Sequence, residues 1–339
     1  MKRLHTLLMI VLLISVTQSQ TLESISFPVL GKVQPRHARD ILASNWSVGA
    51  ETMDRDYTLY ANWKEYLGPL GIKKARIQAG WARTEKEKGV YDFAWLDDIV
   101  FNMHRQGVEP WMCLCYGNLL YSPSGIEVGS ALPREEEALV AWEDWVSQVV
   151  VRYKDVIDEW EVWNEPNNHK ENTPQVYADF LLRTATAVRE VQPDAIVIAF
   201  GLGRFDISWI EAVLDHVQNA DKLHLIDQVT YHPYKYNPDK SYPQVAALRQ
   251  AIARYSDRIM IRQGECGAPS TRLHTRASLA NHDWTEISQS KWALRRLLGD
   301  LGRDIPSSIF AMMDMKYPAG MNIKGLLKSR DDQTVEYAK

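Results

Sequence analysis

Two glutamates in this sequence lie at the ends of apolar runs. Glu165 belongs to Glu159-Trp-Glu-Val-Trp-Asn-Glu-Pro-Asn167, and Glu265 belongs to Ile259-Met-Ile-Arg-Gln-Gly-Glu-Cys-Gly267. Two facing carboxyl groups can share the work of bond cleavage, because one protonates a leaving oxygen while the other attacks carbon and forms a covalent intermediate. This pair is the strongest chemical signal in the chain.

The residues around the two glutamates place both of them at strand ends. Pro166 lacks an N–H and cannot extend a β-ladder, so it predicts that a strand ends just before Glu165. Gly264 and Gly267 flank Glu265 and permit close approach of backbone or ligand. If the strands form a parallel barrel, their C-terminal ends face the active site. Both carboxyl groups would then meet at one rim.

The chain alternates short apolar runs with longer amphipathic segments, a pattern typical of βαβ units and a parallel sheet. We expect strands at 46–50, 74–79, 109–115, 159–163, 195–200, 228–231, 259–263 and 308–312. Eight such strands predict an α/β protein with a closed (β/α)₈ TIM barrel. Glu165 would end the fourth strand and Glu265 the seventh.

Apolar residues at helical spacing predict helices between these strands, with Gly107 and Gly302 as stop signals. The expected helices cover 57–67, 93–106, 135–153, 175–191, 207–217, 244–255 and 288–301. After the eighth strand the chain passes Gly320 and reaches Lys339 without a further helical pattern. We therefore expect a barrel that lacks its last helix through C-terminal truncation.

The first 19 residues have the pattern of a secretory signal peptide. Basic residues at positions 2 and 3 precede an apolar run at 7–14, which is too short to span a bilayer as a mature helix. We expect residues 1–19 to be removed and residues 20–339 to form one domain, secreted or periplasmic, with no membrane attachment. An uncleaved N-terminal anchor is the alternative. The sequon at Asn45 coincides with the first strand, so we expect it to be buried and unglycosylated.

The composition excludes some partners. A net charge of −4, a pI near 6.2 and the absence of a basic stripe exclude nucleic acid and favour a neutral substrate. Cys113, Cys115 and Cys266 are odd in number and are expected to be unpaired packing residues. The histidines lack the spacing of a zinc site, so we expect neither a metal nor a cofactor. The oligomeric state is not indicated.

The two glutamate motifs together resemble a known group of proteins. Asn164-Glu165-Pro166 after the fourth strand, with Glu265 after the seventh, is similar to the retaining (β/α)₈ glycoside hydrolases of clan A, the 4/7 superfamily. The pattern is closest to family 39 xylosidase-like and family 5 cellulase-like members and extends over about 46–318. The resemblance implies that Glu165 is the acid/base, that Glu265 is the nucleophile, and that the substrate is a carbohydrate.

The resemblance also implies supporting residues, each with a plainer alternative. Asn164 would bind a sugar 2-hydroxyl, or else cap the strand end. Arg76 matches the arginine that holds the nucleophile ionised, or else forms an ion pair with Glu161 inside the barrel. His232 and Tyr234 follow the sixth strand, where clan members place residues beside the nucleophile. A structural role is the alternative for His232.

Further sugar contacts are expected at rim positions. Trp81, Asn118 and Trp163 follow predicted strands, although each could equally be a packing residue. Clan members often carry a tryptophan after the eighth strand, whereas this sequence offers Asp314 or Lys316 in its place. The sequence therefore does not identify the sugar that the site binds.

These observations predict a secreted retaining O-glycosidase that cleaves plant or microbial poly- or oligosaccharides by double displacement. The alternative is a carbohydrate-binding TIM barrel without catalysis, or an inactive fragment. Sequence alone does not decide the sugar, the linkage, or whether cleavage is at chain ends or inside the chain, because loops determine these choices.

Overall fold

The computed structural model describes residues 28, 31–32, 34–123, 125–272 and 278–339. Residues 35–339 form one compact unit, and residues 1–34 form another, of which only four residues are described. The expected signal peptide at 1–19 lies outside the described residues. No helix within the described ranges is both long enough and apolar enough to span a membrane.

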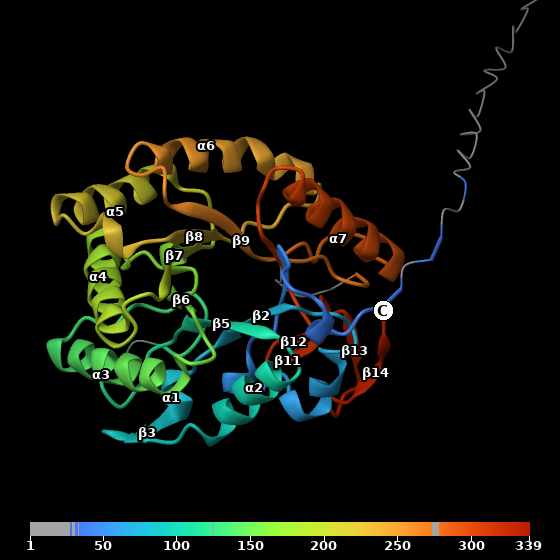
Figure 1. Cartoon of the computed structure of the whole chain (residues 1–339), viewed down its shortest axis with the longest axis horizontal. Coiled ribbons are helices and arrows are strands. Elements are labelled where there is room, and N and C mark those ends of the chain that lie inside the picture. The colour runs from blue at the N-terminus through green and yellow to red at the C-terminus, as the bar shows by residue number, and fades with distance from the viewer. Residues whose placement is uncertain (1–27, 29–30, 33, 124, 273–277) are drawn as a thin grey trace, which may run out of the picture. The chain divides into compact units, whose positions relative to one another are not determined.

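Eight parallel strands close into a barrel, as the sequence predicts (Figure 1). Their order around the barrel follows the chain, and the first strand pairs with the last through Trp46, Ser47 and Val48. The barrel strands are β1 (Trp46–Gly49), β2 (Lys74–Gln78), β5 (Glu109–Leu114), β6 (Glu159–Val162), β7 (Ile196–Leu202), β8 (Gln228–Tyr231), β9 (Met260–Cys266) and β10 (Ser307–Ile309).

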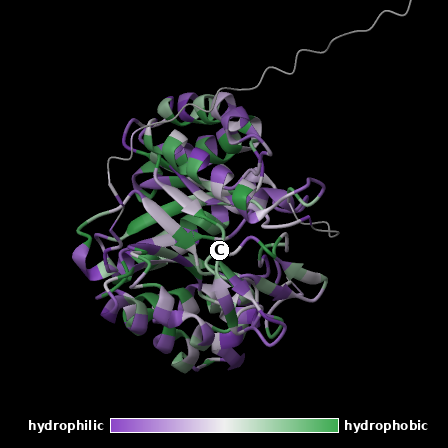
Figure 2. Cartoon of the chain, turned by 90° about the vertical axis from the view of Figure 1, so that its right-hand side faces the viewer, coloured by the Kyte–Doolittle hydropathy of each residue, from purple (hydrophilic) through white to green (hydrophobic). Residues whose placement is uncertain are grey.

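Helices surround the barrel (Figure 1). They are α1 (Trp81–Thr84), α2 (Ala94–Arg105), α3 (Glu136–Tyr153), α4 (Pro174–Val191), α5 (Ile207–Asn219), α6 (Tyr242–Ala253) and α7 (Glu286–Leu301). Local sequence explains several starts: Thr173 caps α4 ahead of a proline, and Thr285 forms a capping box with Ser288 at α7. Figure 2 shows hydrophobic residues concentrated in the barrel strands and hydrophilic residues on the outer helical turns.

The helix expected at 57–67 is wrong. This segment forms two 3₁₀ turns, Tyr60–Asn62 and Lys64–Tyr66. Trp63 lies between them with φ −137° and ψ −1°, outside the helical region, and its indole N–H donates to Thr58. The Asn62 amide donates to the carbonyl of Gln333. Contacts with distant residues therefore override a helical apolar pattern here.

Two β-hairpins follow β10 where an eighth helix was missing from the sequence pattern. They are β11–β12 (Met315–Tyr317 and Gly320–Asn322) and β13–β14 (Leu327–Ser329 and Val335–Ala338). Leu327 is fully buried, and Val335 packs against the main core. In Figure 1 these hairpins lie between α7 and α2. The barrel closes without Val335–Ala338, and the hairpins cover apolar surface that would otherwise face water.

A small hairpin, β3–β4 (Glu85–Glu87 and Val90–Tyr91), precedes α2.

Two smaller expectations can be checked directly. Cys113, Cys115 and Cys266 are free and buried, which confirms that they are packing residues. Asn45 is exposed, so the expectation of a buried sequon is wrong. It precedes β1 at the N-terminal end of the barrel, and its backbone carbonyl accepts a hydrogen bond from the N–H of Ser307. Pairing of the backbone therefore does not bury the side chain.

Candidate active site

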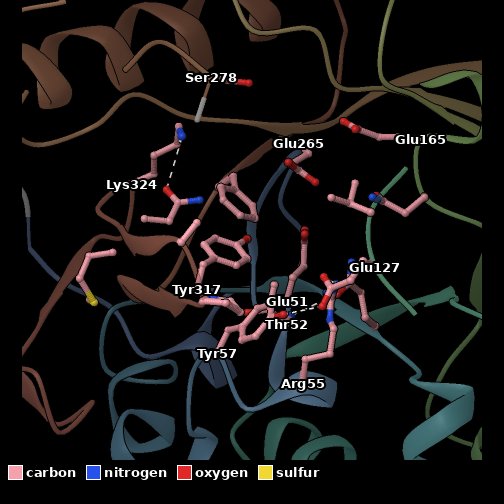
Figure 3. Close-up of a pocket in the computed structure, with 18 of the residues that line it drawn as sticks. Glu51, Thr52, Arg55, Tyr57, Glu127, Glu165, Glu265, Ser278, Tyr317 and Lys324 are labelled. Carbon is pink, nitrogen blue, oxygen red and sulfur yellow. Dashed lines mark hydrogen bonds and ion pairs between the residues drawn. The ribbon is translucent and has the colours of Figure 1, made fainter. Parts of the chain in front are cut away.

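A cavity of about 620 Å³ opens at the C-terminal ends of the barrel strands (Figure 3). Both Glu165 and Glu265 line it, which confirms that the barrel brings them to the same rim. Other lining residues come from strand ends, from the segments that follow the barrel strands and from the β11–β12 hairpin: Glu51, Thr52, Arg55, Tyr57, Gln78, Tyr116, Glu127, Asn164, Tyr234, Phe310, Tyr317, Met321, Asn322 and Lys324.

The backbone turns sharply at Glu165. This residue has φ 52°, in the left-handed region that side chains rarely adopt, and its N–H donates to the carbonyl of Gly201. The turn aims the carboxylate at the cavity, where Asn168 Nδ2 donates to Oε2 at 2.7 Å. One carboxylate oxygen of Glu165 lies within 4.8 Å of one of Glu265.

Arg76 connects most of the acidic groups in the upper part of the barrel. Its Nη1 lies 3.2 Å from Glu265 Oε2 and 2.9 Å from Glu51 Oε1, and its Nε donates to Glu161 Oε2 at 2.6 Å. The Nη2 atom donates to Asn164 Oδ1 at 2.8 Å. The two readings of Arg76 from sequence, contact with the nucleophile candidate and an ion pair with Glu161, are therefore both present.

His232 lies between three carboxylates. Its Nδ1 is 3.4 Å from Glu165 Oε1 and 3.8 Å from Glu265 Oε2, while Nε2 is 3.8 Å from Glu161 Oε1. Burial alone would lower the pKa of His232, but Glu161 and Glu165 raise it to about 9. The imidazole is thus held as a cation, in contact with both glutamates of the site.

Glu161 and Glu51 are both buried but ionise differently. Burial alone would raise the pKa of Glu161, yet Arg76, His232 and Thr230 hold it at about 2. For Glu51 burial prevails over its contact with Arg76, and the charge of Glu265 adds to the effect, so its pKa rises to about 8. Glu51 is therefore a neutral carboxylic acid at neutral pH.

Two further side chains complete the surroundings of the glutamates. Tyr234 donates its hydroxyl to Glu265 Oε1 at 2.7 Å. Asn164 donates to the hydroxyl of Tyr116 at 2.8 Å, which orients its amide toward the cavity wall.

A Cβ on Gly264 would come within 2.9 Å of His232 Nε2, so this position needs glycine for the imidazole to fit. The corresponding atom on Gly267 would meet the carbonyl of Phe310.

Three residues predicted either as sugar contacts or as packing residues, Trp81, Asn118 and Trp163, do not line the cavity. Trp81 and Trp163 are fully buried among aromatic rings, Trp81 against Tyr121 and Trp163 against Phe180. Asn118 is buried as well: its amide donates to the carbonyl of Glu85 and its side-chain oxygen accepts from a backbone N–H. These side chains pack the layer between strands and helices instead of reaching the rim.

The segment after β10 also differs from expectation. Asp314 is buried in an ion pair with Lys339, and Lys316 is exposed and donates to the carbonyl of Asp331, so neither lines the cavity. The β11–β12 hairpin brings Tyr317 into the cavity wall instead. No local pattern indicates this, because the fold of the hairpin decides which side chains face inward.

Sequence reasoning also missed Glu51, Glu127 and Lys324 at the cavity. Glu51 could have been found, since it follows the first strand by the same rule that identified Glu165. Arg55 also lies on the cavity wall, where it contacts Asp54 and Glu127. Glu127 comes from the long loop between β5 and α3 and had no recognisable signal.

Metal binding can be judged from the donor atoms. Within the described ranges, Glu165, His232 and Glu265 form the group whose ligand atoms all lie within 4.8 Å of one another. A protonated imidazole has no free lone pair, and Glu265 already accepts from Arg76 and Tyr234. The donor chemistry of this group therefore suits a proton-transfer site better than a metal centre.

Comparison with known proteins agrees with this geometry. The sequence profile described as "Glycosyl hydrolases family 39" matches residues 61–263. A search of curated proteins found no match. The fold is similar to that of a family 39 glycoside hydrolase from Bacteroides cellulosilyticus WH2, with a TM-score of 0.64 at 21% identity, covering 84% of this chain and 60% of that one.

Two other solved structures are similar to the same extent. A monomeric β-xylosidase from Caulobacter crescentus CB15 has a TM-score of 0.63 at 18% identity, covering 87% of this chain and 66% of that chain. A GH39 enzyme from Xanthomonas axonopodis pv. citri has a TM-score of 0.64 at 19% identity, covering 84% and 62%. The chain thus spans about 60% to 66% of the length of these three structures.

Proposed function

Because the chain belongs to glycosyl hydrolase family 39, we propose that it is a retaining O-glycosidase that cleaves glycosidic bonds by double displacement. The observation that carries the proposal is the proximity of its two rim carboxylates: one oxygen of Glu165 lies within 4.8 Å of one oxygen of Glu265. Retaining enzymes hold their carboxyl groups about 5–5.5 Å apart, whereas inverting enzymes need about 6.5–9.5 Å to admit a water molecule.

The surroundings of the two glutamates support distinct roles. Glu265 accepts from the Arg76 guanidinium and from the Tyr234 hydroxyl, and these two contacts fix the position of its carboxyl group. It therefore suits the nucleophile. Glu165 contacts His232 and Asn168. Its place in Asn164-Glu165-Pro166, at the end of the fourth barrel strand, supports the acid/base role.

The reaction would proceed in two balanced steps. The Glu265 carboxylate forms a bond to the anomeric carbon as the glycosidic C–O bond breaks, and Glu165 transfers its proton to the leaving oxygen. A water molecule then attacks the same carbon, Glu165 takes one of its protons, and the bond to Glu265 breaks. Asn164, held by Arg76 and Tyr116, is placed to bind a sugar hydroxyl beside the reacting carbon.

The location and the broad substrate class are part of the same proposal. Export to the cell exterior or periplasm is supported by the basic and apolar pattern of residues 1–19. Plant or microbial poly- and oligosaccharides are the proposed substrates, and the Caulobacter crescentus structure with a similar fold is described as a β-xylosidase. A carbohydrate-binding barrel without catalysis is disfavoured, because such a protein would not need both carboxylates aligned with Arg76 and Tyr234.

The experiment is an assay of a panel of aryl glycosides with the wild type and with Glu165→Gln. We expect the variant to lose about 10²- to 10⁴-fold on substrates with poor leaving groups, and far less on 2,4-dinitrophenyl glycosides, whose release needs no proton. Proton NMR of the first-formed sugar should show the anomer of the substrate. Equal losses on both kinds of leaving group, or the opposite anomer, would contradict the proposal.

A further inference from the structure

Asn168 forms a side-chain hydrogen bond with Glu165 at the rim of the barrel. It ends the 3₁₀ turn Pro166–Asn168, whose N-cap is Glu165, and its backbone N–H donates to the carbonyl of Glu165 at 3.1 Å. The side chain returns along the same turn, so that Nδ2 donates to Glu165 Oε2 at 2.7 Å. The carboxyl group is therefore held by a residue only three positions further along the chain.

Glu165 meets a different partner at each of its carboxyl oxygens. His232 Nδ1 lies 3.4 Å from Oε1, whereas Asn168 Nδ2 lies 2.7 Å from Oε2, so the contact with Asn168 is the shorter of the two. Contacts at both oxygens restrain the rotation of the carboxyl group more than one contact does. A general acid needs this restraint, because it must lie within hydrogen-bond reach of the atom that it protonates.

The loop that follows β7 leaves room for the Asn168 side chain. A Cβ on Gly203 would overlap the amide of Asn168, since it would lie 2.6 Å from Cγ and nearer still to Nδ2. Asn167 joins the same two segments: its Oδ1 accepts from the N–H of Gly203 at 3.0 Å, and its Nδ2 donates to the carbonyl of Arg204 at 2.9 Å. Two separate loops therefore hold the Asn168 amide against Glu165.

Glu165 borders two hollows of the rim. It lines the 620 Å³ cavity together with Glu265, and a second hollow of about 450 Å³ together with Asn168, Gly203 and Arg204. Asn168 thus reaches Glu165 from the side of the second hollow, whereas Glu265 faces it across the first. This placement fits an action of Asn168 through Glu165 better than contact with the sugar that Glu265 attacks.

We propose that Asn168 is a positioning residue for the acid/base, whose amide holds the Glu165 carboxyl group in the orientation that delivers a proton to the leaving oxygen. This inference rests on the proposed role of Glu165. An amide suits both steps of that role, because its NH₂ group donates to a carboxylate and its oxygen accepts from a carboxylic acid. Asn168 is exposed, so its amide can turn over between the two steps.

The first experiment compares leaving groups on the sugar that the wild type hydrolyses fastest. The ratio kcat/KM reports the transition state of the first step relative to free enzyme and substrate. We expect Asn168→Ala to lower kcat/KM for the phenyl glycoside by about 3- to 10-fold. The value for the 2,4-dinitrophenyl glycoside should stay nearly unchanged, because its release needs no proton. Equal losses on both substrates would overturn the inference.

Gly203→Ala tests the same contact without altering Asn168. The added methyl group takes the place of an amide at the end of a flexible side chain, so the fold should absorb it while the contact with Glu165 is lost. We expect the same selective loss on the phenyl glycoside. The double variant should lose no more than either single variant, because both changes remove one interaction. Additive losses would contradict the inference.

Two further variants serve as controls, and urea unfolding of each variant checks its folding. Asn168→Asp keeps the shape of the side chain but removes the amide donor, so the selective loss should persist. Wild-type activity of Asn168→Asp would overturn the inference. Asn219→Ala changes an exposed asparagine at the end of α5 and should affect neither substrate. A selective loss in Asn219→Ala would also contradict the inference.

Crystal structures of the wild type, Asn168→Ala and Gly203→Ala separate this inference from the proposed function. We expect the Glu165 carboxyl group to leave its wild-type position in both variants. An unchanged carboxyl position would overturn the inference, even if the wild type hydrolyses glycosides. Absence of hydrolysis by the wild type would contradict the proposed function, whereas a displaced carboxyl group would still show that Asn168 positions Glu165.

Discussion

The barrel interior holds two groups of charged residues that are built differently. The lower group, near the N-terminal strand ends, consists of Lys74, Glu159 and Arg262, and Glu159 accepts from both cations. The upper group consists of Glu51, Arg76, Glu161, His232 and Glu265. The Trp111 ring separates them, 5.5 Å from the Arg76 guanidinium and 4.8 Å from that of Arg262.

The two groups differ in the ionisation of their buried carboxyl groups. Burial would raise the pKa of Glu159, but Arg262 and Lys74 hold it at about 2, so Glu159 is ionised and forms ion pairs with both side chains. In the upper group the carboxyl groups outnumber the cations, and Glu51 keeps its proton up to about pH 8. The lower group thus fits a role in stability, whereas the upper group contains a buried carboxyl group that keeps its proton beside the carboxyl groups of the cavity.

The largest expected effect is the loss of catalytic activity when a carboxyl group of the upper group is replaced. We expect Glu265→Gln to reduce kcat by at least about 10⁴-fold, because the amide cannot form the covalent intermediate. Arg76 keeps Glu161 and Glu51 as partners, so the variant should unfold in urea at nearly the wild-type midpoint. Residual activity above one per cent of the wild type, with contaminating enzyme excluded by purification from a host lacking glycosidases, would contradict this assignment.

The second largest effect is a loss of folding stability when the carboxyl group of the lower group is replaced. Glu159→Gln leaves Arg262 buried without an anionic partner, so we expect a loss of about 3 kcal/mol in the free energy of unfolding. The kcat of the folded variant should stay close to the wild-type value. Urea unfolding and an aryl-glycoside assay measure both quantities. Adding Arg262→Met should recover part of the loss, since the uncompensated cation is then removed.

The smallest effect concerns Glu51 and depends on pH. Glutamine resembles the neutral carboxyl group, so near pH 5 Glu51→Gln should change stability by only about 1 kcal/mol or less. Folding raises the pKa of Glu51 from the ordinary value of 4.5 to about 8. The resulting contribution to the free energy of unfolding is fully present below pH 4.5 and is lost as the pH rises toward about 8. The wild type should therefore lose stability relative to the variant across this window.

Thermal unfolding of both proteins between pH 4 and pH 9 measures this difference. The groups that face Glu51 are Arg76, Glu265 and His232, and they are the same in both proteins. A stability difference that stays constant with pH would show that Glu51 is ionised in the folded protein. The contrast between the upper and lower groups would then be smaller than the structure indicates.

Much of the site was predictable because its residues obey a local rule. Glu165 and Glu265 end apolar strands, and parallel strands in a closed barrel bring such ends to one rim. Arg76 was also accessible, since it lies within a strand whose alternate side chains face the barrel interior. Trp81 and Trp163 follow strands too, yet they turn outward into the aromatic layer beneath the helices. Strand position alone does not give the direction of a side chain past the strand end.

By itself, the sequence determined the eight-stranded barrel and its two rim glutamates, because hydrophobic periodicity and strand breakers act over a few residues. Tertiary structure alone decided that Glu51 keeps a proton, that residues 57–67 form 3₁₀ turns, and that the β11–β12 hairpin and Lys324 form one wall of the cavity. These features depend on burial and on contacts between segments far apart in the chain. Such contacts leave no periodic pattern in the residues that make them.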